Sequence, residues 1–302
     1  MNILIRADSS FDIGIGHIMR DLVLAKQYAN DNVIFATQDL PHNINHKILE
    51  SGFTIELLES NKFEKLDILI KKLQIDMIVI DHYGIDYEFE RQLKTSNSNL
   101  KIFVLDDTYE KHCCDILLNH NISADESKYT GKVPENCELR CGSKYTLLRE
   151  EFIIEKSKPK IINEKTTIFV AMGGADHSNI NINILEVLKD FDNTQVDLVT
   201  TNANKNLEAL KRYCNNKKWI NLHINSTEIA KLMKNSDFAI VTPSVTVNEV
   251  VFMELPLIAI KTAENQDGIY QYLDSQKYLC LGNYDAVGLK NRVIDVCKTL
   301  SL

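Results

Sequence analysis

The sequence lacks the long apolar run that a membrane-spanning helix needs. No stretch of its 302 residues approaches about 18 consecutive apolar side chains. Its first residues, MNILIRADSS, have the pattern of a strand, whereas a signal peptide has a charged segment followed by a long apolar run. From these absences we expect a cytoplasmic protein that does not contact a membrane.

Regular cysteine spacing and an excess of basic residues are also missing. The seven cysteines are odd in number and two of them, Cys113 and Cys114, are adjacent, which is a poor basis for a disulfide framework. We therefore expect reduced thiols. The formal net charge of −8 argues against a general nucleic-acid surface, so we expect no nucleic-acid partner. Nothing in the sequence suggests an obligate interface, and we expect a monomer.

Three familiar binding motifs are absent. The turn DIGIGHIMRD has Met19 where a dinucleotide fingerprint needs its third glycine, and it lacks the Gly-Lys-Ser/Thr of a P-loop. No metal-ligand spacing such as His-Glu-x-x-His occurs, and the spacing of Cys137 and Cys141 is irregular for structural zinc. The residues therefore indicate no metal and no bound cofactor.

What the chain does have is an alternation of strand and helix patterns. In the first half, we predict strands at 2–6, 32–37, 53–58, 76–84 and 101–107, with helices at 17–29, 63–73 and 86–95. In the second half, we predict strands at 166–174, 196–201, 238–244 and 256–262, with helices at 182–191, 226–237, capped by Ser226, and 245–255. This order favours parallel sheets covered by helices.

A charged segment, 150–165, separates the two halves and lacks sustained periodicity. The sequence therefore predicts an α/β protein with two Rossmann-like domains, 1–155 and 163–302, that face each other across a cleft. The tail reads as a strand followed by an amphipathic helix from Ala286 to Leu300. We expect that helix to cross back to the first domain.

The first candidate catalytic residue is His17, which follows Gly14 and Gly16 in the first strand-to-helix turn. Ligands of such sheets bind beyond the carboxyl ends of the strands. The positive end of a helix disfavours an imidazolium, so a histidine there is expected to be neutral and able to act as a general base. The glycines would let a substrate approach the backbone. The alternative is a solvated histidine without a role.

Two turns in the second half could hold a diphosphate. Gly173 and Gly174 follow a strand and precede a helix, and Ser244 begins another helix. Glu249, early on that second helix, could accept hydrogen bonds from ribose hydroxyls. A plain turn and a carboxylate that complements the helix dipole are the alternatives.

Further polar residues end other strands. Asn265 and Gln266 offer amide groups for sugar or phosphate contacts, although an ordinary loop would contain them too. Asp8, Asp81 and Asp106 could bind a metal, bind sugar hydroxyls or orient loops.

Together these segments resemble one family over nearly the whole chain. The resemblance rests on motifs that occur in order: RADSSFDIGIGHIMRDLVLAKQY, IDHYG, LDD, CDILLN, LRCG, LLREEF, MGGAD, VNE and ENQ. They resemble the UDP-sugar hydrolases of pseudaminic acid biosynthesis. That family has the glycosyltransferase-B fold and resembles the lipid II-forming N-acetylglucosaminyltransferase.

The resemblance implies release of UDP from UDP-2,4-diacetamido-2,4,6-trideoxy-β-L-altropyranose without a metal. His17 would activate a water that attacks the anomeric carbon, with C–O cleavage and inversion. UDP contacts are implied for Gly173, Gly174, Ser244, Asn248 and Glu249. Contacts with the rest of the substrate are implied for Asp8, Gly14, Gly16, Tyr83, Asn265 and Gln266. Among these, Asp8 is the candidate that fixes the histidine tautomer.

Three other functions fit parts of this pattern. An inverting UDP-sugar glycosyltransferase would use the same base, but it needs an acceptor groove that the first half does not clearly show. A hydrolysing UDP-sugar 2-epimerase would use several carboxylates around the sugar, and aspartates do end several strands. A non-catalytic nucleotide-sugar sensor would have no need of His17.

Overall fold

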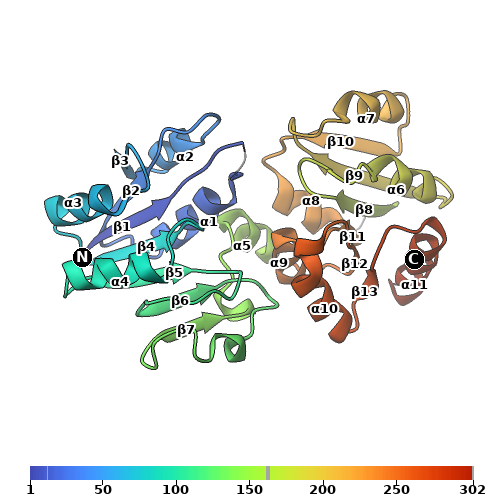
Figure 1. The fold of residues 1–302 in the computed structure, drawn as a ribbon. Coiled ribbons are helices and arrows are strands. Elements are labelled where there is room, and N and C mark those ends of the chain that lie inside the picture. Colours follow the sequence, from blue (N-terminus) through green and yellow to red (C-terminus); the bar gives the residue numbers. More distant parts are fainter. Residues whose placement is uncertain (12, 161–163, 301–302) are drawn as a thin grey trace. The chain divides into compact units, whose positions relative to one another are not determined.

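The computed structural model describes residues 1–11, 13–160 and 164–300 and divides into two compact units, Met1–Arg149 and Glu150–Leu302 (Figure 1). The predicted first domain ended at residue 155, which lies inside a helix of the second unit. Residue 163, where the second domain was expected to begin, and residue 302, where it was expected to end, lie outside the described residues.

The first unit contains one seven-stranded sheet in which all neighbouring strands are parallel. Its strands are β1 (Asn2–Ala7), β2 (Asn32–Thr37), β3 (Thr54–Leu57), β4 (Met77–Asp81), β5 (Lys101–Leu105), β6 (Ile116–Asn119) and β7 (Glu138–Cys141). Its helices are α1 (Gly16–Lys26), α2 (Asn45–Glu50), α3 (Phe63–Leu73) and α4 (Tyr87–Ser96), with 3₁₀ turns at Glu126–Tyr129 and Ser143–Tyr145. The strand order is β3-β2-β1-β4-β5-β6-β7.

This sheet is buried on both faces. Leu4 of β1 packs in one core cluster with α3 and α4, while Ile3 and Ile5 pack in another cluster with α1 and α2. The alternation follows from the period of two in a strand. Apolar side chains on both faces are what a parallel sheet between helix layers requires.

The second unit contains a six-stranded parallel sheet in the order β10-β9-β8-β11-β12-β13. Its strands are β8 (Thr166–Ala171), β9 (Thr194–Thr200), β10 (Ile220–Ile224), β11 (Phe238–Val241), β12 (Leu257–Ile260) and β13 (Leu279–Leu281). Its helices are α5 (Glu150–Ser157), α6 (Asn181–Leu188), α7 (Leu207–Cys214), α8 (Ile229–Asn235), α9 (Val245–Phe252), α10 (Asp267–Ser275) and α11 (Ala286–Leu300), with a 3₁₀ turn at Glu264–Gln266.

Two local predictions for this unit were wrong. Helix α11 has the predicted bounds but packs within the second unit, because Leu289, Val293 and Val296 are buried in its core beside α6. Helix α8 begins at Ile229 with Glu228 as its N-cap, whereas Ser226 was expected to cap it. The Ser226 hydroxyl instead accepts a hydrogen bond from the Glu228 backbone.

Each sheet has a point where the strand order reverses. In the first unit it lies between β1 and β4, and in the second between β8 and β11. At such a point the connections leave toward opposite sides and open a crevice beyond the carboxyl ends of the strands. Among the described residues, no helix is long and apolar enough to cross a bilayer.

Candidate functional site

A short hydrogen bond joins His17 to the neighbouring strand at the reversal point of the first sheet. Ala7 of β1 lies opposite Asp81 of β4, and the His17 Nδ1 atom lies 2.7 Å from Asp81 Oδ1. His17 is the second residue of α1, and its residue exposure is 7%. The helix start thus presents the imidazole at the strand ends, next to a buried carboxylate.

Arg20 donates hydrogen bonds to both oxygens of that carboxylate. Its Nε atom donates to Asp81 Oδ2 at 2.6 Å and its Nη2 atom donates to Oδ1 at 2.5 Å, which is a bidentate pair. Burial opposes ionisation of Asp81, but the charge and hydrogen bonds of Arg20 outweigh it and hold the pKa of this carboxyl well below its usual range. Asp81 is therefore a carboxylate at neutral pH.

An ionised Asp81 decides where the proton of a neutral His17 lies. A carboxylate only accepts hydrogen bonds, so the 2.7 Å contact places a proton on His17 Nδ1. Arg20 Nη2 lies 3.1 Å from the same nitrogen, but it makes its shorter hydrogen bond to Asp81 Oδ1. The other ring nitrogen, Nε2, then carries the lone pair. This arrangement is the one a general base needs, with a second group that fixes its tautomer.

Tyr83 packs beside this imidazole. The two rings meet edge to face with centroids 5.0 Å apart, and the Tyr83 hydroxyl donates to Asp107 Oδ1 at 2.9 Å. Partial burial and the Asp107 charge raise the pKa of Tyr83 to about 12, so the phenol keeps its proton. Arg20 Nη1 also reaches Asp107, at 3.3 Å from Oδ2.

Asp8 does not support His17 as the sequence analysis expected, because other groups occupy its carboxylate. Arg6 donates to both oxygens, at 2.7 and 2.6 Å, and the Gln38 backbone donates to Oδ1 at 2.7 Å. His82 Nε2 lies 3.2 Å from Oδ2. Asp8 is 1% exposed, so its effect on a ligand would pass through these neighbours.

Two more titratable side chains are buried close to the Arg20–Asp81 pair. Burial and the Asp81 charge raise the pKa of Asp21 well above its usual range, and burial and the Arg20 charge lower the pKa of His120 to about 4. His120 is therefore uncharged at neutral pH, and burial favours the protonated form of the Asp21 carboxyl. The side-chain oxygens of Asp21 and the ring nitrogens of His120 have no hydrogen-bond partner among the described residues.

The glycines before His17 shape the turn that leads to α1. Gly14 has a φ of +83°, which side chains with a Cβ rarely adopt, and its N–H donates to the Ser10 carbonyl at 2.9 Å. Gly16 is the first residue of the helix, and a Cβ there would meet nothing within 4 Å. A Cβ at either position would therefore meet open space.

In the second unit, the predicted phosphate turn differs from the expected geometry. Gly173 has a φ of +80°, and a Cβ on Gly174 would lie 2.8 Å from Thr201 Cγ2, so both positions favour glycine. However, α6 begins only at Asn181, and Asp176 accepts its first N–H groups at 3.3 to 3.4 Å. The Ile180 and Asn181 N–H groups are therefore already bonded to Asp176 and are not free for an anion.

The remaining predicted nucleotide residues follow β11. Ser244 is the N-cap of α9, and its side chain makes no capping hydrogen bond. Asn248 is buried, and Glu249 is half-buried on the same helix.

The two predicted amide residues after β12 differ in their contacts. The Gln266 side-chain oxygen accepts the Thr262 N–H at 2.8 Å and the Ala263 N–H at 3.3 Å, which fastens the turn. Asn265 is exposed.

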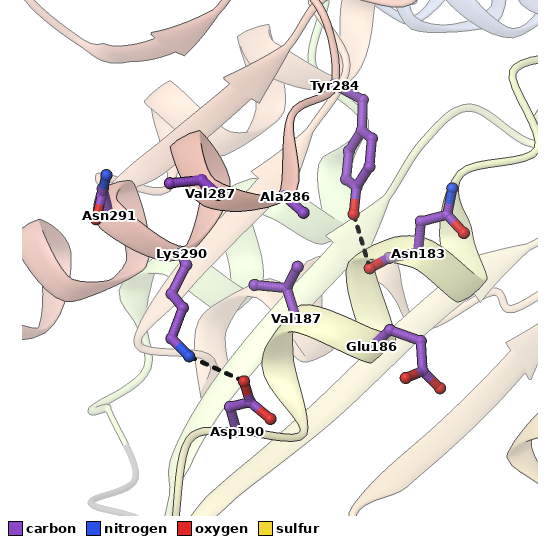
Figure 2. Close-up of a pocket in the computed structure, with 9 residues that line it drawn as sticks. All are labelled: Asn183, Glu186, Val187, Asp190, Tyr284, Ala286, Val287, Lys290 and Asn291. Atoms are coloured by element: carbon purple, nitrogen blue, oxygen red, sulfur yellow. Dashed lines mark hydrogen bonds and ion pairs between the residues drawn. The ribbon is translucent and has the colours of Figure 1, made fainter.

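The structure also contains a cavity of about 370 Å³ between α6 and α11 (Figure 2). Its polar groups pair with one another. Tyr284 donates to the Asn183 carbonyl at 3.0 Å, and Lys290 pairs with Asp190 at 2.9 Å. No group of three or more His, Cys, Asp or Glu residues is placed to hold a metal ion in the described part of the chain.

Two parallel α/β units with polar side chains beyond their strand ends are typical of the glycosyltransferase-B fold. MurG of Acinetobacter baumannii superposes with a TM-score of 0.68 at 12% identity, covering 99% of this chain and 92% of that one. The UDP-GlcNAc 2-epimerase of Neisseria meningitidis gives a TM-score of 0.63 at 10% identity, covering 99% and 92%. These likenesses confirm the predicted fold.

Sequence comparison narrows this class to one family. The chain is 37% identical over 279 residues to the UDP-2,4-diacetamido-2,4,6-trideoxy-β-L-altropyranose hydrolase of Campylobacter jejuni, covering 92% of this chain and 98% of that protein. It is 24% identical over 272 residues to the spore coat polysaccharide biosynthesis protein SpsG of Bacillus subtilis, covering 88% and 79%. No family model matches the chain. The chain belongs to the family of the Campylobacter hydrolase, so the predicted resemblance is confirmed.

Proposed function

We propose that the protein hydrolyses a UDP-sugar, with UDP-2,4-diacetamido-2,4,6-trideoxy-β-L-altropyranose as the substrate. The observation that carries the proposal is the 2.7 Å hydrogen bond from His17 to Asp81, because it leaves Nε2 of the imidazole as a base. Membership in the family of the Campylobacter hydrolase supports the choice of substrate.

In the proposed reaction, His17 Nε2 takes a proton from a water molecule as its oxygen attacks the anomeric carbon. The new C1–O bond forms on the face opposite the leaving group, so the configuration inverts. The old bond between C1 and the diphosphate oxygen breaks, and its electron pair leaves with UDP. Asp81 stabilises the imidazolium that forms, and the proton then passes to solvent.

Protein groups would receive the charge of the departing diphosphate. We assign the UDP moiety to the glycine turn Gly173–Gly174 and to Ser244, Asn248 and Glu249. Backbone N–H groups and a helix start stabilise such an anion. Asn265, Gln266 and Tyr83 are proposed contacts to the rest of the substrate.

Hydrolysis in ¹⁸O-labelled water tests the reaction class. The expected result is UDP release with the label on C1 of the sugar and none in UDP, because water attacks carbon. Mass spectrometry of both products measures this. Label in UDP would show attack at phosphorus, and release of a C2-epimerised sugar would identify an epimerase.

Chelation tests whether the reaction depends on protein groups alone. We expect EDTA to leave the rate of UDP release unchanged, because backbone N–H groups and helix ends are proposed to receive the diphosphate charge. The measurement is the initial rate before and after chelation, with Mg²⁺ added back as the control. A rate that falls with EDTA and returns with Mg²⁺ would contradict the metal-free mechanism.

A further inference from the structure

A larger cavity, of about 530 Å³, lies in the first unit beyond the ends of β4 and β5. Apolar side chains from these strands and the following turn form part of its wall: Ile80, Ile85, Val104 and Leu105. Its volume falls in the range of about 300 to 1,000 Å³ typical of small-molecule sites. None of the functions proposed above uses it.

One buried side chain that lines this cavity, His112, has a ring nitrogen without a hydrogen-bond partner among the described residues. His112 is 7% exposed, and its Nδ1 atom lies 2.7 Å from Glu90 Oε1. The Nε2 atom has no hydrogen bond among the described residues, and Asp106 Oδ1 lies 3.8 Å away, beyond hydrogen-bond distance. The cavity between α6 and α11 offers a contrast, because its Tyr284 hydroxyl and Lys290 ammonium are both paired.

His112 is charged at neutral pH. Burial opposes its charge, but Asp106 and Glu90 outweigh burial and raise the pKa of His112 to about 9. Both ring nitrogens therefore carry protons, and Nε2–H is a donor that needs an acceptor. A buried donor without a partner costs about 1 to 3 kcal/mol, so an occupant with an acceptor oxygen is favoured.

The charges around the cavity exclude an anionic occupant. The residues that line it include four acids, one lysine and two histidines: Asp86, Glu88, Asp106, Glu110, Lys111, His82 and His112. A phosphate or carboxylate would be repelled by this acidic lining. A neutral carbonyl oxygen would accept from His112 without that repulsion, and the apolar wall would take the carbon atoms beside it.

Tyr83 connects the cavity to the catalytic base. It lines the cavity, and its ring packs against the His17 imidazole with centroids 5.0 Å apart. The cavity and the proposed base therefore share Tyr83 as a neighbour. A substituent of the sugar being cleaved is the kind of group that such a neighbouring cavity could receive.

We propose that this cavity binds an acylamino substituent of the sugar, with its carbonyl oxygen on His112 Nε2 and its acyl carbons against the apolar wall. The inference rests on the proposed UDP-sugar hydrolysis and identifies the part of the substrate that the first unit recognises. Because an acetyl group occupies only a fraction of 530 Å³, the cavity also accepts longer acyl chains.

The proposal is tested by placing a bulky side chain at the edge of the cavity. Glu88 and Glu110 are exposed residues that line it from two different elements, so Glu88→Trp and Glu110→Trp should fold normally. Each is expected to lower kcat/KM for the diacetamido substrate by about tenfold or more, the scale of losing an apolar pocket contact. Inhibition by UDP, which has no acylamino group, should not change. Val287→Trp, at the exposed rim of the other cavity, is the matched control.

A second arm replaces His112 and varies the acyl group. His112→Phe should impair the acetylated substrate but leave UDP inhibition unchanged, and the wild-type protein should accept N-hexanoyl analogues better than Glu110→Trp does. If the wild-type protein releases UDP and both rim variants have the same kcat/KM as the wild type, the cavity assignment alone is overturned. Absence of UDP release by the wild-type protein would overturn the proposed function and this inference with it.

Discussion

Replacing His17 with alanine is expected to lower kcat for UDP release by about 10³-fold, within the ~10² to 10⁴ that a general base contributes. The substitution removes the proton acceptor, while the proposed UDP contacts belong to the other unit. UDP binding should therefore persist. Steady-state kinetics and calorimetric titration with UDP measure the two quantities separately.

His46→Ala is the matched control for this substitution. His46 is an exposed histidine on α2 of the same unit, and the variant should have wild-type kinetics. Turnover of His17→Ala within a few-fold of the wild-type rate would show that another group accepts the proton.

The second large effect is expected for Asp81→Asn, with a loss in kcat of at least about 10²-fold. An asparagine amide can donate to His17 Nδ1, which would move the imidazole proton to Nε2 and remove the base. The variant also removes the ion pair between Arg20 and Asp81, leaving Arg20 with Asp107 at 3.3 Å, and breaking a buried ion pair costs about 3 to 5 kcal/mol. Thermal unfolding should therefore show a lower melting temperature.

A double-mutant cycle separates these two effects of Asp81→Asn. If Asp81 acts through the imidazole, adding Asp81→Asn to His17→Ala should lower kcat little further, although it should still lower the melting temperature. An equal loss of kcat in both backgrounds would mean that Asp81 does not act through His17.

The choice between Asp8 and Asp81 shows how far the sequence could predict the site. Both aspartates end buried strands, and Asp8 is nearer to His17 along the chain. The structure favours Asp81 because β1 pairs with β4, a strand that follows it only after two others. Strand order depends on long-range packing, and a single sequence does not record it.

Local patterns predicted some elements well and missed others. The bounds of β2 and α3 match the prediction, because both have strong apolar periodicity. The predicted strands do not include β6, β7 and β10. β7 and β10 are edge strands whose side chains are mostly half-exposed, so their apolar pattern is weak. β6 is an interior strand, but its four buried residues are too few to show a period.

The capping of α6 also escaped prediction. Gly173 and Gly174 mark a turn that any strand-to-helix connection could contain. Asp176 has a φ of +41°, and its carboxylate accepts hydrogen bonds from the Ile180 and Asn181 N–H groups. Such a local conformation depends on the packing around it.

The hydrogen bond between His17 and Asp81 has a consequence for how the chain folds, because it joins residues 64 positions apart. A nascent chain that has formed only β1, α1 and β2 already contains His17 and Arg20, but not the carboxylate that orients them. The closure of this long loop costs chain entropy before any contact repays it. His17 therefore acquires the tautomer proposed for the base only when β4 docks beside β1, so the proposed activity and assembly of the central sheet would arise in the same step.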